Sequence, residues 1–470
     1  AEAALLEGRI LSTLEAPGAE PAFLAAARFA GAAHDDRLAA DALVRLVETL
    51  ANDQVAGARA LDIAAIVDVL IARASDASDL RANLAAARGD ALLALARYDD
   101  ARAAMLAARR DLLAADADSH DVVAVTGALA TVAKDTGDLA LARSLGEEAL
   151  AAEIRLDGPA HPRVASILNN LAIAAEDAGD LPQARAYLER ALAIKERAFG
   201  PDTLVVAMSV NNLGNVAAEQ GKLDEADRLY TRALAIREHE LGVDHPLVAT
   251  SLGNLATVRR RQGKLDDALA LAYRSRDIKL AAFGPEHPSV AYAFDAIAHI
   301  LADRGDVPGA RAAFERKLAI NTKALGAEHP KTLNTVLGLG ELLAGANDCR
   351  GAEPYFARAA AGLATAAPDS LDRAEALADL GQCRIAAGNA AQAEVDLRTA
   401  IAIADKAEAG LARRGAMRAV LAAAQWAAGD RAAAIATAQA GVAQLVDAGA
   451  EGASDLAELR AWLTKHRPPR

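Results

Sequence analysis

The stretch Thr203–Asp244, TLVVAMSVNNLGNVAAEQGKLDEADRLYTRALAIREHELGVD, decides the fold because much of the chain repeats it. In its first half, apolar and small residues recur with the period of one helix face, at Val206, Val210, Leu213, Gly214 and Ala217. Gly221 ends this helix, and a second stripe follows at Ala226, Leu229, Tyr230, Ala233 and Leu234. Gly242 closes the second helix. The stretch therefore predicts a helix hairpin whose apolar faces need neighbouring hairpins to cover them.

The same unit recurs in a fixed register of 42 residues. Successive copies start at His161, Thr203, His245, His287 and His329. The turn between the two helices holds Gly179, Gly221, Gly263, Gly305 and Asn347, and five positions later come Ala184, Ala226, Ala268, Ala310 and Ala352. One larger core position holds Leu188, Tyr230, Phe314 and Phe356. A two-helix unit repeated in register is typical of a helical solenoid, so the sequence predicts an all-α fold.

The repeated pattern resembles the tetratricopeptide repeat, on the residues Leu213, Gly214, Gly221, Ala226, Tyr230 and Ala233. The length of the unit and the link GPEHP at Gly284–Pro288 resemble the long, kinesin-light-chain-like variant. This resemblance implies a right-handed superhelical α-solenoid of antiparallel helix hairpins, with a concave groove that binds a partner peptide or helix. The looser, Ala- and Arg-rich upstream repeats also resemble the C-terminal repeat region of bacterial serine/threonine protein kinases.

Repeat regularity divides the chain into four segments. We predict divergent N-terminal repeats over 1–118, a regular array over 119–370, divergent C-terminal repeats over 371–450, and a capping helix with a basic tail over 451–470. The turns of the divergent C-terminal copies fall at Gly388 and Gly429. The chain lacks an initiator Met and begins inside a predicted helix, so we expect the numbering to start partway into a longer gene product.

Charge and composition restrict the class of partner. The formal net charge of −13 weighs against nucleic acid and anionic membranes, since both require a basic face. No segment approaches the roughly 20 apolar residues that a membrane span needs. Aromatic residues make up only 3% of the chain, so we expect a core of leucine and alanine. These features predict a cytoplasmic protein that binds a protein or peptide and could also associate with itself.

The chain has two cysteines, Cys349 and Cys383, in adjoining repeats. They form no CxxC pair and have no metal-binding spacing. Nothing else in the sequence suggests an oxidising compartment. The sequence therefore predicts two free thiols in a reducing cytoplasm, with a disulfide between them as the less favoured alternative.

Histidine recurs at the start of several units, at His161, His245, His287 and His329, each followed by a proline. Stacked hairpins place equivalent residues about 10 Å apart, whereas the ligands of one metal ion lie about 2 Å from it. We therefore interpret these histidines as helix caps, with proline at the first helical position. The sequence predicts no metal site and no cofactor.

The candidate partner-binding residues are polar side chains on the first helix of each unit: Asn169, Asn170, Asn211, Asn212, Asn215, Asn254, Arg260 and Arg261. In the family that the chain resembles, these positions line the concave groove. Asn costs up to about 0.7 kcal/mol relative to Ala inside a helix, so an interaction must offset it. Two interpretations stay open: the amides bridge neighbouring repeats, or they bind the backbone of a docked segment.

Signatures of catalysis are missing from the sequence. It contains no phosphate-binding GxxxxGK[ST] loop, no HExxH zinc motif and no set of kinase motifs. We therefore predict a non-enzymatic scaffold with no catalytic residue. One alternative is the regulatory or substrate-recruiting C-terminal region of a bacterial serine/threonine kinase whose catalytic domain lies outside this chain. A weaker alternative is a peptide-sensing regulator.

Overall fold

A computed structural model describes the chain except residues 14–17, 52–55, 75–76, 96 and 467–470. The described residues form 23 α-helices and one short 3-10 helix, and they include no strand. The predicted all-α fold of helix hairpins is confirmed. None of the helices in the described part is long and apolar enough to cross a membrane.

The described residues divide into two compact units, Ala1–Ala282 and Phe283–Arg470. Unit 1 contains α1 (Glu2–Thr13), α2 (Ala19–Ala32), α3 (Asp36–Ala51), α4 (Gly57–Arg73), α5 (Ser78–Ala94), α6 (Tyr98–Ala115), α7 (His120–Asp135), α8 (Leu139–Asp157), α9 (Pro162–Asp177), α10 (Leu181–Phe199), α11 (Leu204–Glu219), α12 (Leu223–Leu241), α13 (Pro246–Arg261) and α14 (Leu265–Phe283), which ends at the division. Unit 2 contains α15 (Pro288–Asp303), α16 (Val307–Leu325), α17 (Pro330–Gly345), α18 (Cys349–Ala366), α19 (Leu371–Ala386), α20 (Ala390–Lys406), α21 (Leu411–Ala428), α22 (Arg431–Asp447), the 3-10 helix η1 (Gly449–Gly452) and α23 (Ala453–Lys465).

The hairpin predicted from Thr203–Asp244 forms helices α11 and α12. Between them, Gly221 has φ of 74°, a left-handed conformation that glycine adopts without a Cβ clash. In a later copy, Asn347 takes the same role with φ of 61°. Asn tolerates this conformation better than most residues, which confirms its predicted equivalence to the turn glycines.

Close packing of each hairpin depends on the small-residue position. Ala184, Ala226, Ala268, Ala310 and Ala352 are all fully buried. The larger core position is buried as well, with Leu188, Tyr230, Phe314 and Phe356 each at most 4% exposed. A Cβ atom added to Gly214 would lie 2.7 Å from the Tyr230 ring, so this glycine is needed for the close approach. These contacts confirm the predicted register.

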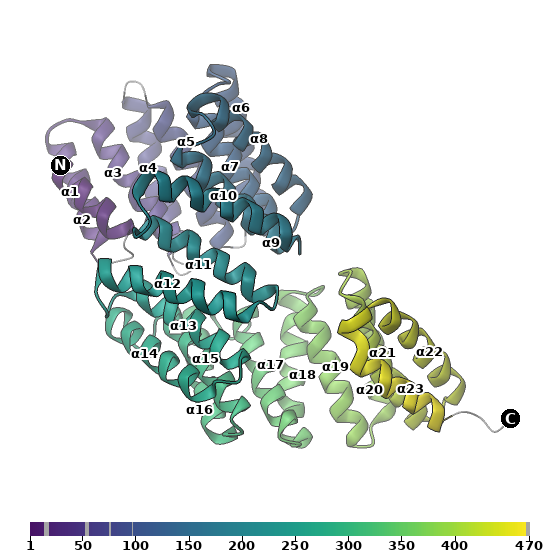
Figure 1. The fold of residues 1–470 in the computed structure, drawn as a ribbon. Coiled ribbons are helices and arrows are strands. Elements are labelled where there is room, and N and C mark those ends of the chain that lie inside the picture. Colours follow the sequence, from purple (N-terminus) through teal and green to yellow (C-terminus); the bar gives the residue numbers. More distant parts are fainter. Residues whose placement is uncertain (14–17, 52–55, 75–76, 96, 467–470) are drawn as a thin grey trace. The chain divides into compact units, whose positions relative to one another are not determined.

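Successive hairpins stack because the second helix of one hairpin packs on the first helix of the next, as α8 does on α9 and α12 on α13 (Figure 1). The first helices also pack on one another, in the row α3, α5, α7 and α9 of unit 1 and the row α17, α19 and α21 of unit 2. We call the surface of these rows the inner face of each unit. Side chains from consecutive repeats meet on this face.

The C-terminal end of unit 2 follows the prediction for its turns and its last helix. Gly388 and Gly429 have φ of 83° and 95°, as expected at hairpin turns. The predicted capping helix is α23, which packs on α22 and buries Leu459. The basic tail beyond residue 466 lies outside the described residues. The division into four segments by repeat regularity stays a prediction.

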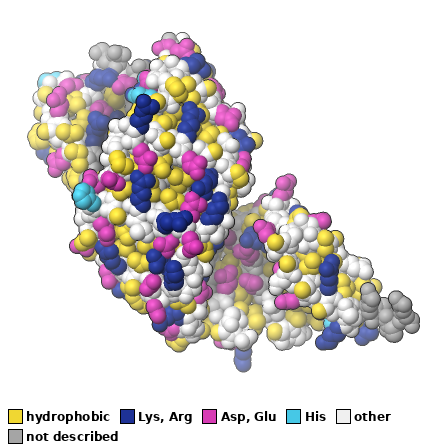
Figure 2. Space-filling view, viewed as in Figure 1, with side chains coloured by type: hydrophobic (Ala, Val, Ile, Leu, Met, Phe, Trp, Pro, Cys, Tyr) yellow, Lys and Arg dark blue, Asp and Glu magenta, His cyan; other side chains and the backbone are white. Residues whose placement is uncertain are grey.

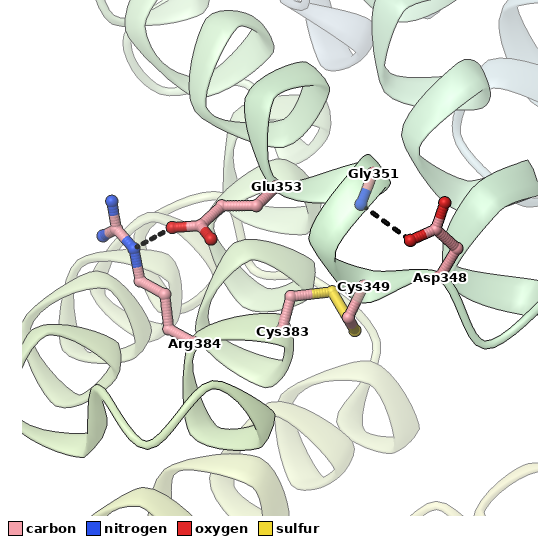
Figure 3. The surroundings of a disulfide bond; sticks show 6 residues. All are labelled: Asp348, Cys349, Gly351, Glu353, Cys383 and Arg384. Atoms are coloured by element: carbon pink, nitrogen blue, oxygen red, sulfur yellow. Dashed lines mark hydrogen bonds and ion pairs between the residues drawn. A yellow bond between two sulfur atoms is a disulfide. The ribbon is translucent and has the colours of Figure 1, made fainter.

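The prediction of two free thiols is wrong in this structure, because Cys349 and Cys383 form a disulfide (Figure 3). Cys349 begins α18 and Cys383 lies in the second half of α19, with their Cα atoms 5.0 Å apart. In stacked hairpins, the second helix of one repeat packs along the first helix of the next. The bond therefore joins adjacent repeats at their packing interface, which a comparison of sequence spacings did not reveal.

Candidate functional site

The inner face of unit 1 is hollowed where α5, α7 and α9 lie side by side. The hollow has a volume of about 1090 Å³. We call it the N-terminal groove, and its polar lining consists of Asp79, Asn83, Asp90, Tyr98, His120, Asp121, Thr131, Asp135, Glu153, Arg163, Ser166 and Asn170. Small residues of α7, Ala124, Gly127 and Ala128, form part of its floor. The first helices of three consecutive repeats therefore build one open surface with both polar and apolar side chains.

The N-terminal groove carries more acidic than basic side chains. Burial, and to a smaller extent the neighbouring carboxylates of Asp135 and Glu48, raise the pKa of Asp90 to about 6. Arg163, which also lines the groove, places Nη1 3.4 Å from a carboxylate oxygen of Asp157. Acidic side chains that repel one another in a shared hollow are stabilised by a bound positive charge.

The second helices of the hairpins have a different charge pattern from the groove. Helices α10 and α12 lie nearest the viewer in Figure 1, and the same view in Figure 2 shows acidic and basic side chains interspersed over this face. Many of these charges pair directly, as Arg232 does with Glu196. Interspersed charges are typical of a solvated surface, so this face does not share the acidic excess of the groove.

Four of the predicted asparagines form bridges between consecutive repeats. The Nδ2 atom of Asn212 donates to Oδ1 of Asn169 at 2.8 Å, and Nδ2 of Asn254 donates to Oδ1 of Asn211 at 3.1 Å. Each bridge joins first helices of neighbouring hairpins. The structure therefore supplies the first of the two predicted interactions. An amide has two N–H donors and a carbonyl acceptor, so bridging leaves further hydrogen bonds available.

The remaining predicted residues take separate roles. Asn170 is exposed and lines the N-terminal groove, and Asn215 accepts a hydrogen bond from the Tyr230 hydroxyl at 2.7 Å. Arg261 donates to the backbone carbonyl of Ala218 at 2.7 Å, while Arg260 is half-buried on α13. Of the eight predicted residues, Asn170 alone is among those that line the N-terminal groove.

Acidic side chains recur on the inner face beyond this groove. On α9, burial raises the pKa of Glu176 to about 7, with a further contribution from Glu219 on α11 and from Asp177. In unit 2, burial together with Glu341 and Glu375 raises the pKa of Asp379 to about 7. The sequence analysis did not identify these groups, because their proximity depends on how consecutive first helices align.

The histidines at the unit starts cap helices as predicted. The Nδ1 atoms of His161, His245, His287 and His329 each accept the backbone N–H two residues later, and a proline occupies the start of each helix. The distances are 3.1 to 3.4 Å. A capping interaction satisfies a backbone donor that the first turn leaves without an intrahelical partner.

The tetratricopeptide-repeat family matches residues 121–197, 205–281, 247–320 and 289–364, which together make up about half of the chain. This chain belongs to the tetratricopeptide-repeat family. No curated protein matches it. This match confirms the predicted resemblance to the tetratricopeptide repeat.

Several solved structures resemble this tetratricopeptide-repeat protein. Repeats of a putative kinesin light chain from Podosopora anserina are 24% identical, with 43% of this chain and 96% of that one covered and a TM-score of 0.39. The apo quorum sensor NprR from B. thuringiensis is 14% identical, with 77% and 98% covered and a TM-score of 0.51. A Rap protein complexed with competence and sporulation factor is 12% identical, with 78% and 98% covered and a TM-score of 0.52. At these identities the likeness concerns the fold.

Sequence analysis missed a group of potential metal ligands on the border of the groove. His120, Glu153 and Asp157 each offer a ligand atom, and these atoms lie within 4.8 Å of one another. The signal that could have found them is a departure from the repeat. One unit before the proline of His161-Pro162, the sequence has Ser119-His120, which places a histidine at the proline position.

Proposed function

We propose that this protein is a non-enzymatic interaction scaffold that binds an extended segment of a partner protein along the inner face of unit 1. The N-terminal groove between α5, α7 and α9 is the principal contact. The partner segment is basic, with lysine or arginine side chains that reach the groove carboxylates.

The observation that carries this proposal is the acidic excess within an open groove. The hollow of about 1090 Å³ is wide enough for several residues of an extended chain. Burial raises the pKa of Asp90, and repulsion between Asp90 and Asp135 adds to this effect. A cationic side chain placed between these two carboxylates would replace their mutual repulsion with attraction to the cation. This electrostatic energy would contribute favourably to the free energy of binding.

The asparagine bridges support the proposal through preorganisation. The pairs Asn169–Asn212 and Asn211–Asn254 connect consecutive first helices before any partner arrives. A rigid surface loses little conformational entropy on binding, so more of the interaction energy contributes to affinity. We propose that the exposed amide of Asn170, together with the free hydrogen-bonding capacity of the bridged amides, contacts the backbone of the bound segment. On α13, beyond this row of helices, Arg260 and Arg261 stay predicted partner-binding residues.

Two of the similar folds provide further support. The NprR structure is described as a quorum sensor, and the Rap protein was solved with a bound factor. Recognition of another molecule by a fold of this type is consistent with the scaffold proposed here. The alternative of a kinase-associated repeat region stays a prediction, which the gene sequence preceding Ala1 would test.

The proposal can be tested by selecting peptides from a random display library on the full chain. We expect the selected sequences to be rich in lysine and arginine, and their affinity to fall with rising salt. The variant Asp90→Asn/Asp135→Asn should weaken binding of a selected peptide, because it removes both carboxylates without changing their size. Fluorescence anisotropy with the labelled peptide would measure the loss.

A matched control is Glu147→Gln, which removes a carboxylate from an exposed position of α8 outside the groove lining. We expect this variant to bind like the wild type. Asn170→Ala should weaken binding without lowering the melting temperature. Selected peptides without a basic bias, or equal affinities for the groove and control variants, would contradict the proposal.

A further inference from the structure

The cluster of His120, Glu153 and Asp157 contains a buried carboxylate whose hydrogen bonding is incomplete. Glu153 is 1% exposed, and its Oε1 atom accepts no hydrogen bond from the described residues. Its other oxygen, Oε2, lies 3.4 Å from Nδ1 of His120. Burying an ionised carboxylate without a full set of partners is costly, so a further positive group is expected beside it.

The later repeats show how this buried position is normally satisfied. The residues in register with Glu153 are Lys195, Arg237, Lys279 and Asn321. Three of these side chains donate to a hydroxyl fourteen residues later, in the pairs Lys195–Ser209, Arg237–Ser251 and Asn321–Thr335. The residue fourteen positions after Glu153 is Ile167, which offers no hydrogen bond. A donor has thus been replaced by an acidic acceptor, and its usual partner by an apolar side chain.

The two neighbours of Glu153 also depart from the repeat. The positions in register with His120 hold Pro162, Leu204, Pro246, Pro288 and Pro330. Those in register with Asp157 hold Phe199, Leu241, Phe283 and Leu325. The hairpin fold therefore requires neither a histidine at the first position nor a carboxylate at the second. Three departures of different kinds meet at one point, where the chain brings an imidazole and two carboxylates together.

The distances between these groups suit a single ion. The ligand atoms lie within 4.8 Å of one another, and Nε2 of His120 is 3.5 Å from Oδ1 of Asp157. Tetrahedral ligands about 2.0 to 2.2 Å from one ion lie about 3.3 to 3.6 Å apart, so side-chain rotation would have to draw the most separated pair together by up to about 1.5 Å. Oδ2 of Asp157 faces Arg163 at 3.4 Å and His161 at 3.1 Å, which leaves Oδ1 for the ion.

We propose that His120, Glu153 and Asp157 bind one divalent transition-metal ion, with Zn²⁺ as the probe. An imidazole ligand favours zinc and its neighbours over calcium and magnesium, which prefer sites built from oxygen atoms alone. Nδ1 of His161 lies 4.0 Å from Oε1 of Glu153 and caps α9, so this histidine borders the site from the next repeat. The ion would link α7 and α8, close to the start of α9. This inference does not rest on the proposed partner binding, although both involve the N-terminal groove.

The access route is the N-terminal groove, which His120 and Glu153 both line. The side chain of His120 is 43% exposed, whereas that of Glu153 is 2% exposed. An ion can therefore enter from solvent, lose part of its hydration and meet the buried carboxylate.

The test is calorimetric titration of the untagged 470-residue chain with Zn²⁺ in the absence of reductant. We expect one Zn²⁺ per chain, accompanied by a rise in melting temperature, and no comparable response to Ca²⁺ or Mg²⁺. His120→Ala should weaken Zn²⁺ binding at least tenfold, since loss of even an outer-shell partner costs about 10- to 100-fold in metal affinity.

A second variant keeps the result interpretable if a single substitution unfolds the repeat. Glu153→Lys/Ile167→Ser recreates the pair that Lys195 and Ser209 form one repeat later, so it should fold and bind no Zn²⁺ at this site. His239→Ala serves as the control, because this histidine is largely exposed on α12 and should leave binding unchanged. The proposal is overturned if the wild type binds no Zn²⁺, or if both site variants bind it as the wild type does. In either case the contacts of His120 with the two carboxylates are structural only.

Discussion

The disulfide between Cys349 and Cys383 leads to a quantitative prediction. The bond joins residues 34 apart in the sequence, and it closes a loop that contains the end of the repeat begun by α17 and the start of the next. Loop-closure entropy predicts a stabilisation of about 3 kcal/mol for 15 residues and about 4.7 kcal/mol for 100. A loop of this size falls between them, at about 3.8 kcal/mol. Removing the bond should lower the free energy of unfolding of unit 2 by up to this amount.

The perturbation is the double variant Cys349→Ala/Cys383→Ala, compared with wild type in the presence and absence of dithiothreitol. Alanine is preferred to serine because Cys383 is 3% exposed and packs in the apolar core of unit 2. Guanidinium denaturation followed by circular dichroism would report the loss. We expect reduced wild type and the double variant to unfold at similar denaturant concentrations, both below oxidised wild type.

This comparison distinguishes the contribution of the disulfide to stability from that of side-chain packing. Dithiothreitol should shift the wild-type transition and leave the double variant unchanged, because the variant contains no cysteine. Titration of thiols in the denatured, unreduced wild type should find none. Two reactive thiols, together with a transition that ignores the reductant, would refute the loop-closure reasoning and restore the free-thiol interpretation.

Three further predictions concern packing and ionisation. Ala226→Leu should lower the free energy of unfolding by about 1 to 3 kcal/mol through overpacking, and an unchanged denaturation midpoint would refute the register. Gly214→Ala should destabilise the fold, because the added methyl group would press on the Tyr230 ring. Gly127→Ala should stabilise the fold by up to about 1 kcal/mol, because nothing lies near this position of α7 and alanine favours helices more than glycine does. Equal effects of the two variants in thermal melts would contradict this contact geometry. The pKa of Asp379 in the folded chain is about 7, above its ordinary value of 3.8. Between pH 3.8 and about 7 the unfolded chain has therefore lost this proton while the folded chain keeps it, so the free energy of unfolding falls as the pH rises through this range. Asp379→Asn should therefore stabilise above about pH 7 and have little effect below about pH 4, and a urea-denaturation series that shows the opposite trend would exclude this ionisation.

Local features of this fold could be read directly from the sequence. The turns at Gly221 and Asn347 follow from backbone conformations that few residues tolerate, and the buried Ala226 and Tyr230 follow from helical periodicity. Each of these features depends on residues within one hairpin or on the strict repetition of that hairpin. Because the repeat has a fixed register, the same turn and core positions could be assigned in the other copies.

The candidate site was only partly predictable. The polar inner positions were found because asparagine disfavours helices, and both bridges involve these residues. The sequence left open whether the amides face each other or a partner. The acidic groove was not predicted, since Asp90 and Asp135 lie on helices whose relative alignment is set by packing.

By itself, the sequence determined the hairpin, its length and the stacking of its copies, because periodicity and turn chemistry act between residues close in the chain. Only the tertiary structure decided which residues of different hairpins meet, as Cys349 meets Cys383 and Glu153 meets His120. These encounters depend on the offset between packed helices. A shift of one helical turn, about 5.4 Å, would separate each pair while leaving the repeat pattern intact.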